Sequence, residues 1–210
     1  MACSSCGIID AVKRVIGITG NMGTGKSTVL RMLEELGAKA IDADLLVHLV
    51  IAKGTTVYEE VVVAFGEGVL GPQGEIDRKR LAPLVFSDGE ALKRLEAIVH
   101  PVVESLIWEI TEEAEEEVVA IEAIKLLEAS SERGWDALWV VTCRPEEQRK
   151  RLLAQGLSEE EIEGRLKAQG PISEKIKAAD VIIDNSGSRE ETWEQVKREW
   201  DKFQEKGGEE

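Results

Sequence analysis

One short segment near the N-terminus carries the clearest chemical signal in this sequence of 210 residues. The pattern G-x-x-x-x-G-K-[ST] is matched by Gly20, Asn21, Met22, Gly23, Thr24, Gly25, Lys26 and Ser27, and Thr28 follows it. Glycines let such a loop turn its N–H groups toward phosphate oxygens, and the next helix N-terminus adds positive partial charge. The Lys26 ammonium can reach the β- and γ-phosphates, and the Ser27 hydroxyl can ligate Mg²⁺. The segment predicts a site for a nucleoside triphosphate with Mg²⁺, and because the sequence has no N-K-x-D guanine signature, we expect ATP.

A second pair with possible chemistry, Asp42 and Asp44, directly follows a short apolar run. Ligands of α/β proteins sit at the carboxyl ends of strands, where one carboxylate can steer Mg²⁺ or water while the other accepts a hydroxyl proton. Either aspartate also suits the N-cap of a helix over residues 45–50, which is a purely structural role. The two residues alone leave both interpretations open.

The elements that must position these residues can be recognised from their patterns. Strand-like runs occupy Arg14–Thr19, residues 38–41, residues 117–121, Ala137–Thr142 and residues 180–184. Most are continuously apolar, which is typical of strands buried on both faces. Helical signals lie between them: an apolar stripe over residues 29–36 that ends at Gly37, a helix that starts at Pro145, and two capping boxes at Ser158-x-x-Glu161 and Ser188-x-x-Glu191. The last helix gathers Trp193, Val196, Trp200 and Phe203 on one face, and we expect that face to be packing.

This alternation of strands and helices predicts an α/β protein with a mostly parallel sheet. Residues 45–110 are mainly helical and too long for one crossover, so we expect an inserted helical subdomain. Residues 144–175 are helical and heavily charged, which suits a lid over a ligand. We expect one domain over residues 14–206, an N-terminal extension over residues 1–13 and a polar tail over residues 207–210.

Taken together, these motifs resemble the dephospho-CoA kinase family over roughly residues 14–196. The phosphate loop and Asp42-Ala43-Asp44 come first. The further elements, in chain order, are Gly74-Glu75-Ile76-Asp77-Arg78, Leu81, Val85-Phe86, Leu95-Glu96, Ile98, His100-Pro101, Gln148, Arg151-Leu152, Gln169, Lys175, Ala179-Asp180 and Asp184-Asn185. Each element is short, and their order and spacing make the resemblance specific.

The resemblance implies a three-layer P-loop kinase fold with a mostly parallel sheet, an inserted helical coenzyme-binding subdomain and a helical lid. It implies transfer of a phosphoryl group from ATP to the ribose 3′-hydroxyl of dephospho-CoA, giving coenzyme A and ADP. By this resemblance Asp44 would be the general base, and Asp42, Asp44, Arg78 and His100 would lie in the acceptor-binding site. Arg151 and Arg165 would close on the phosphates, with Arg151 and Lys26 acting in catalysis.

The chain departs from the family pattern at two places. The family has P-L-L-F-E after the third strand, whereas this chain has Ile124-Lys125-Leu126-Leu127-Glu128, so the shape of that loop differs. The family's lid carries an arginine where this chain has Gln155, which removes one possible phosphate-facing charge.

Composition limits the partners. The chain has 26 basic and 41 acidic residues and a formal net charge of -15, which disfavours nucleic acid and anionic membrane surfaces. No apolar stretch approaches the ~20 residues of a membrane span, and the start lacks a secretory signal pattern. We therefore expect a cytoplasmic enzyme, a monomer or small homo-oligomer, whose partners are the small molecules ATP and dephospho-CoA.

Other candidate residues have simpler explanations. Cys3-x-x-Cys6 has the spacing of half a zinc site but no second pair, so an N-terminal extension without a metal is favoured. Cys143 follows a buried strand and is expected to be a packed thiol. His48 suits a packed or surface position as well as a ligand contact. His100 precedes Pro101, so we expect it to end a helix.

Two alternatives to dephospho-CoA kinase remain from the sequence. One is a P-loop kinase of another small hydroxyl acceptor, such as a sugar or nucleoside, which the order of the Asp-Ala-Asp and Asp-Arg elements disfavours. The other is a nucleotide-binding relative without turnover, which Gln155 suggests and the presence of Arg151 and Arg165 disfavours.

Overall fold

The computed structural model describes residues 13–123 and 134–207. A parallel sheet of β1 (Arg14–Thr19), β2 (Lys39–Asp42), β3 (Val118–Glu122), β4 (Ala137–Thr142) and β5 (Val181–Asp184) has the order β2-β3-β1-β4-β5. The strand predictions for Arg14–Thr19 and Ala137–Thr142 are confirmed, and the other three are correct to within one residue at each end. β1, which leads into the phosphate loop, therefore lies in the middle of the sheet.

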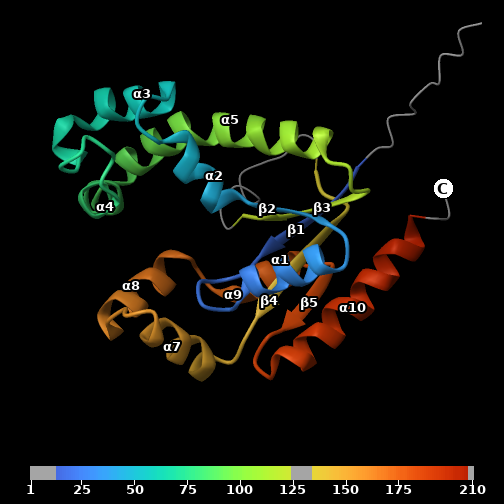
Figure 1. Ribbon diagram of the computed structural model, residues 1–210. Coiled ribbons are helices and arrows are strands. Elements are labelled where there is room, and N and C mark those ends of the chain that lie inside the picture. Colours follow the sequence, from blue (N-terminus) through green and yellow to red (C-terminus); the bar gives the residue numbers. More distant parts are fainter. Residues whose placement is uncertain (1–12, 124–133, 208–210) are drawn as a thin grey trace, which may run out of the picture.

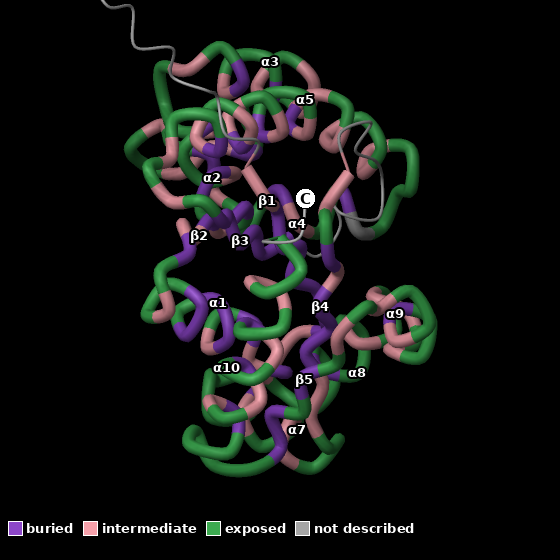
Figure 2. The backbone as a smooth tube through the Cα atoms, turned by 90° about the vertical axis from the view of Figure 1, so that its right-hand side faces the viewer, coloured by how far each residue is buried: buried purple, intermediate pink, exposed green. Residues whose placement is uncertain are grey.

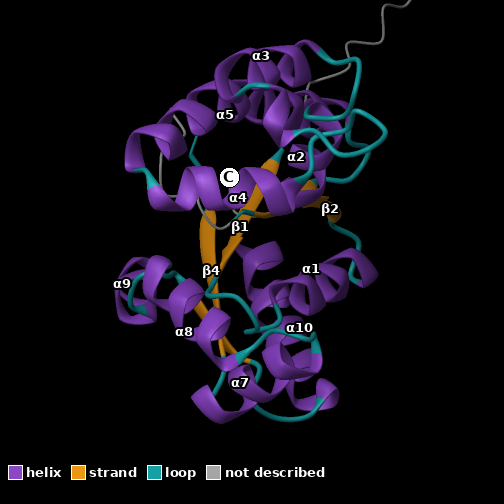
Figure 3. Cartoon of the chain, turned by 90° about the vertical axis from the view of Figure 1, so that its left-hand side faces the viewer, coloured by secondary structure: helices purple, strands orange, loops and turns teal. Residues whose placement is uncertain are grey.

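The sheet is the central one of three layers (Figures 1 and 3). On one face lie α1 (Lys26–Glu35) and α10 (Arg189–Lys206), which bury Val29, Leu33, Val196 and Trp200 against the sheet. The apolar face expected for the last helix is thus confirmed as packing. On the other face lies a helical group inserted between β2 and β3. Its members are α2 (Ala43–Val50), α3 (Thr56–Phe65), the 3₁₀ turn η1 (Glu67–Val69), α4 (Arg78–Ser87) and α5 (Gly89–Glu113).

β1 shows why its residues form a central strand. Val15 packs into the core beneath the inserted helices, whereas Ile16 and Ile18 pack toward α1 and α10. Successive side chains of a strand point to opposite faces, so a strand that is covered on both faces must be apolar at every position. Figure 2 shows this burial continuing through the neighbouring strands.

After β4 come three short helices, α7 (Pro145–Ala154), α8 (Glu159–Ala168) and α9 (Ile172–Ala178). Pro145 occupies the first turn of α7, and both predicted capping boxes form, at Ser158 with Glu161 and at Ser188 with Glu191. In the residues that the structure describes, no helix has the length and apolar character needed to cross a membrane.

The expectation that His100 ends a helix is wrong, because α5 continues through His100 and Pro101 to Glu113. Proline removes one backbone hydrogen bond from a helix. Val99 and Val103 lie on either side of Pro101 and are both buried in the core, and this packing keeps the helix continuous. Cys3, Cys6 and the altered segment at residues 124–128 lie outside the described residues.

Candidate active site

The phosphate loop connects β1 to α1 at the carboxyl edge of the sheet. Its last glycine, Gly25, has φ +93°, a left-handed conformation that favours glycine. A Cβ atom at Gly25 would lie 2.0 Å from Nδ2 of Asn185, so the close approach of Asn185 also requires glycine. Both backbone conformation and packing therefore explain this residue of the motif.

Side chains from distant segments hold the outer side of the loop. The Asn185 amide donates to the Thr24 carbonyl at 2.8 Å, and its Oδ1 accepts from the Thr192 hydroxyl at 2.9 Å. The Met22 carbonyl accepts from Gln148 at 2.7 Å, and the Met22 N–H donates to Gln169 at 2.8 Å. The peptide groups of the loop are thus oriented by residues more than 100 positions along the chain.

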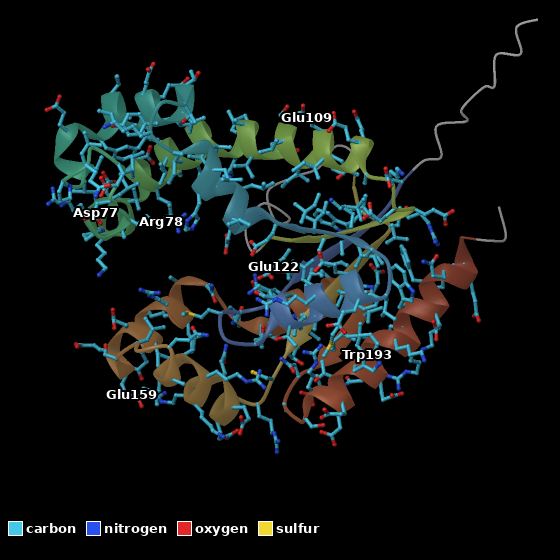
Figure 4. The ribbon with its side chains drawn as sticks, viewed as in Figure 1. Asp77, Arg78, Glu109, Glu122, Glu159 and Trp193 are labelled. Atoms are coloured by element: carbon cyan, nitrogen blue, oxygen red, sulfur yellow. The ribbon has the colours of Figure 1, made fainter. Side chains whose placement is uncertain are left out.

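Lys26, the lysine of the motif, is buried and forms an ion pair with Glu122 at the end of β3, 3.5 Å between Nζ and Oε1. β3 and β1 are neighbouring parallel strands, with Ile18 paired to Glu122, so the end of β3 reaches the start of the loop. Figure 4 shows Glu122 in the middle of the molecule, at this edge. The pair links the phosphate loop to the adjacent strand.

Glu122 is a candidate site residue that the sequence analysis missed. Burial raises the pKa of its carboxyl, and the Lys26 ammonium and a hydrogen bond from the Ser27 hydroxyl oppose that rise. The negative charges of Asp42 and Asp44 raise this pKa further. Its Oε2 atom is buried without a hydrogen-bond partner among the described residues. The available signal was an acidic residue at the end of an otherwise apolar strand.

This arrangement suits a magnesium ion bound together with a nucleotide. Mg²⁺ is usually held by one or two carboxylates, substrate phosphates and water rather than by a protein cage. Within the described ranges no group of three or more His, Cys, Asp or Glu side chains could enclose a metal. The Ser27 hydroxyl and the unpartnered oxygen of Glu122 fit the smaller ligand set.

The two candidate aspartates have different environments. Asp42 ends β2 and caps α2, since its Oδ1 accepts a hydrogen bond from the Leu45 N–H at 3.1 Å. The structural alternative raised for Asp42 is therefore observed. Asp44 lies in the first turn of α2 and is exposed, so its carboxylate is the one open to a substrate.

Arg78 and His48 share the electrostatic environment of Asp44. Burial lowers the pKa of the Arg78 guanidinium, and the nearby Asp44 carboxylate opposes that effect. The pKa of His48 is lowered by burial and by Arg78, against the opposing charges of Asp44 and Asp42. Arg78 is the first residue of α4, and Figure 4 shows it between α4 and α2. The helical insertion thus gathers an acid, a cation and an imidazole near the end of β2.

His100 is half-buried near the middle of α5. Its helical position differs from the extended backbone expected before a proline. Among the residues described, no hydrogen bond or ion pair joins its side chain to Asp44 or Arg78. The structure therefore does not connect His100 directly with that group.

Arg151 lies against the phosphate loop, where its guanidinium donates to the carbonyls of Thr24 at 3.3 Å and Asn185 at 2.7 Å. Arg165 is exposed on α8, and in the described part of the chain no hydrogen bond joins it to the loop. Gln155, which replaces the family's arginine, is exposed at the C-cap of α7. The three positions thus differ, and of the three, Arg151 alone has a hydrogen bond to the loop among the described residues.

A cavity of about 490 Å³ opens beside the carboxyl end of β1. It is lined by Thr19, Trp135, Leu138, Gln169, Pro171, Glu174, Lys175 and Ala178. The Thr19 hydroxyl oxygen is buried and has no hydrogen-bond partner among the described residues. Cys143 follows β4 and lies against the phosphate loop, with Sγ 3.8 Å from the Gly23 carbonyl oxygen, and burial raises the pKa of its thiol.

The chain is similar in sequence to known proteins. The family model described as dephospho-CoA kinase matches residues 14–191. A dephospho-CoA kinase of Aquifex aeolicus is 48% identical over 189 residues, covering 90% of this chain and 96% of its own length. A second relative, the dephospho-CoA kinase of Symbiobacterium thermophilum, is 45% identical over 191 residues, which cover 89% of this chain and 80% of that protein.

The chain is also similar to solved structures. The crystal structure of TT1252 from Thermus thermophilus is similar with a TM-score of 0.80 and 39% identity, covering 90% of this chain and 96% of that one. Dephospho-CoA kinase from Campylobacter jejuni has a TM-score of 0.63 and 28% identity, covering 93% of this chain and 99% of that one. A shikimate kinase from Bacteroides thetaiotaomicron shares the fold, with a TM-score of 0.54 and 18% identity, covering 91% of this chain and 98% of that one.

Proposed function

Because the chain belongs to the dephospho-CoA kinase family, we propose that it transfers the γ-phosphoryl group of ATP to the ribose 3′-hydroxyl of dephospho-CoA. The products are coenzyme A and ADP. The observation that carries this proposal is the juxtaposition at one sheet edge of the phosphate loop, the Lys26–Glu122 pair and the exposed Asp44. A phosphate-binding loop beside a free carboxylate is what transfer to a hydroxyl acceptor requires.

The nucleotide is bound by the loop over residues 20–28, where the N–H groups at the start of α1 face its phosphates. Lys26 neutralises charge on the β- and γ-phosphates, and the arriving triphosphate competes with Glu122 for its ammonium. Ser27 and Glu122 would hold the magnesium ion. When bound, Mg²⁺ neutralises phosphate charge and orients the transferred group.

Asp44 acts as the general base. Its carboxylate accepts the proton of the 3′-hydroxyl as that oxygen forms a bond to the γ-phosphorus, and the bond from phosphorus to the bridging oxygen breaks to release ADP. Asp42 is less suited to this step, since one of its oxygens is engaged in capping α2. Arg78 lies near Asp44 and binds an anionic part of dephospho-CoA, and His100 contributes to the same helical acceptor region.

The three helices α7 to α9 form a lid over the nucleotide, and the inserted helices α2 to α5 receive the coenzyme. Arg151 supplies positive charge near the transferred group while its contacts with the Thr24 and Asn185 carbonyls hold it in place. Arg165 approaches the phosphates only when α8 closes. An arginine of this kind contributes up to ~10³–10⁵ in rate where it is the principal one.

The proposal is tested by incubating the protein with ATP, Mg²⁺ and a panel of acceptors, and measuring ADP formation. The panel contains dephospho-CoA, adenosine, shikimate and no acceptor. Dephospho-CoA should give the highest kcat/KM. A higher value with another hydroxyl acceptor would contradict the assignment of substrate, and ADP formation with no acceptor dependence would contradict transfer altogether.

The role of Asp44 is tested separately with Asp44→Asn and the matched variant Asp42→Asn. Loss of a positioned general base should lower kcat by roughly 10²–10⁴ in Asp44→Asn, with ATP binding little changed. Asp42→Asn should lower kcat less, because an amide oxygen can still accept the Leu45 hydrogen bond. A larger loss of kcat in Asp42→Asn would reverse the assignment.

A further inference from the structure

The peptide groups on either side of Met22 are held from two separate segments. Nε2 of Gln148, in α7, donates to the Met22 carbonyl at 2.7 Å. Oε1 of Gln169, directly after α8, accepts from the Met22 N–H at 2.8 Å. A third contact runs beside them, from Nδ2 of Asn21 to the Gly170 carbonyl at 3.3 Å. Two glutamines, one a donor and one an acceptor, are thus hydrogen-bonded to the backbone of one loop residue.

These contacts do more than satisfy buried polar groups. Met22 is only half-buried, so water could also reach its N–H and carbonyl groups. A pair of side-chain hydrogen bonds, unlike mobile water, fixes the orientation of the peptide. The next residue, Gly23, is confined as well, since a Cβ there would lie 2.8 Å from Cγ of Leu152 in α7.

The position of Met22 explains why its orientation matters. It is the third residue of an eight-residue phosphate-binding motif and precedes the residues whose N–H groups must converge on phosphate. A rotated Met22 peptide would shift those groups. Binding is tighter when the donors are already in place, because less conformational freedom is lost.

We propose that Gln148 and Gln169 are positioning residues that hold the phosphate loop in its nucleotide-binding conformation and couple it to the α7–α9 segment. The inference rests on the proposed use of ATP. Gln148 acts as a hydrogen-bond donor and Gln169 as an acceptor, and this asymmetry provides the test. Replacement by glutamate removes the donor but retains an acceptor of nearly the same shape.

The experiment compares Gln148→Glu and Gln169→Glu by calorimetric measurement of the Kd for ATP with Mg²⁺, and of kcat and KM with dephospho-CoA. Gln155→Glu is the control for added charge, because Gln155 is exposed on the same lid segment. Gln148→Glu places a carboxylate against the Met22 carbonyl, so its Kd should exceed that of Gln169→Glu by about 5- to 50-fold. Both glutamates approach the same loop residue, so repulsion of the triphosphate affects both variants.

Gln148→Met and Gln169→Met, which remove each hydrogen bond without adding charge, should both raise the Kd for ATP by about 3- to 10-fold. The melting temperature without ATP is measured for every variant. A purely structural role predicts lower melting temperatures with the Kd of the parent, which would overturn the proposal. Equal Kd values for the two glutamate variants would also overturn it. Failure of the parent to bind ATP would instead refute the proposed function, so the two failures are distinguishable.

Discussion

Substitution of Gly25 by alanine should disrupt the phosphate loop through two separable effects. The first is conformational: at φ +93° an alanine costs about 1–2 kcal/mol relative to its preferred backbone region. The second is steric, because the new methyl group would lie 2.0 Å from Nδ2 of Asn185. Asn185 must then move and lose its hydrogen bond to the Thr24 carbonyl, which costs about 1–3 kcal/mol for a buried polar group.

Gly156 provides a matched control. Its φ is +86°, and a Cβ at this position would meet no atom within 4 Å. Gly156→Ala should therefore show the conformational effect alone, about 1–2 kcal/mol, whereas Gly25→Ala should lose about 2–5 kcal/mol.

Urea denaturation followed by circular dichroism gives the free energy of unfolding of both variants, and calorimetry gives the Kd for ATP. Gly25→Ala should be the less stable by about 1–3 kcal/mol and should bind ATP weakly. Gly156→Ala should bind ATP with the affinity of the parent. Equal destabilisation of the two variants would show that the contact between Gly25 and Asn185 does not constrain the loop.

Four further substitutions test other parts of the site. Lys26→Ala should abolish turnover and weaken ATP binding, measured by ADP release and calorimetry, because the loop loses its point charge; near-normal activity would refute the role of the loop. Arg151→Ala should lower kcat strongly, and a kcat equal to that of the parent would exclude this arginine from the site. Gln155→Arg should leave kcat unchanged or raise it, since position 155 is exposed. Burial raises the pKa of Glu122, so its carboxyl binds a proton more tightly in the folded protein than in the unfolded chain. The stability that this protonation contributes is lost as the pH rises through the raised pKa. Glu122→Gln cannot titrate, so without metal its stability relative to the parent should increase as the pH rises above the ordinary pKa of a glutamate, about 4.3. A pH-independent difference would contradict the raised pKa.

The features that the sequence predicted correctly depend on short segments. The strand at Arg14–Thr19 has no polar residue between Arg14 and Thr19, and the phosphate loop follows it with its complete motif. The capping boxes at Ser158 and Ser188 each depend on a glutamate three residues later, and both form. Each of these patterns contains its own physical cause within a few residues, so no knowledge of distant contacts was needed.

The features that were missed or wrong depend on contacts between distant segments. Glu122 is significant because β3 lies beside β1, and that strand order cannot be read from the five residues of β3. His100 was expected to end a helix on the local preference of residues before proline, but packing of the flanking valines outweighs that preference. The sequence analysis also missed the hydrogen bonds of Arg151 to two carbonyls of the loop region, because they depend on where α7 packs.

The most direct test of the proposed reaction is to determine where the γ-phosphoryl group of ATP goes. The protein is incubated with γ-¹⁸O-labelled ATP, Mg²⁺ and dephospho-CoA, and the product is analysed by ³¹P NMR and mass spectrometry, with Lys26→Ala as the inactive control. The account predicts labelled phosphate on the ribose 3′-oxygen, in an amount equal to the ADP formed. Label found only in inorganic phosphate, or on any other position of the acceptor, would contradict it.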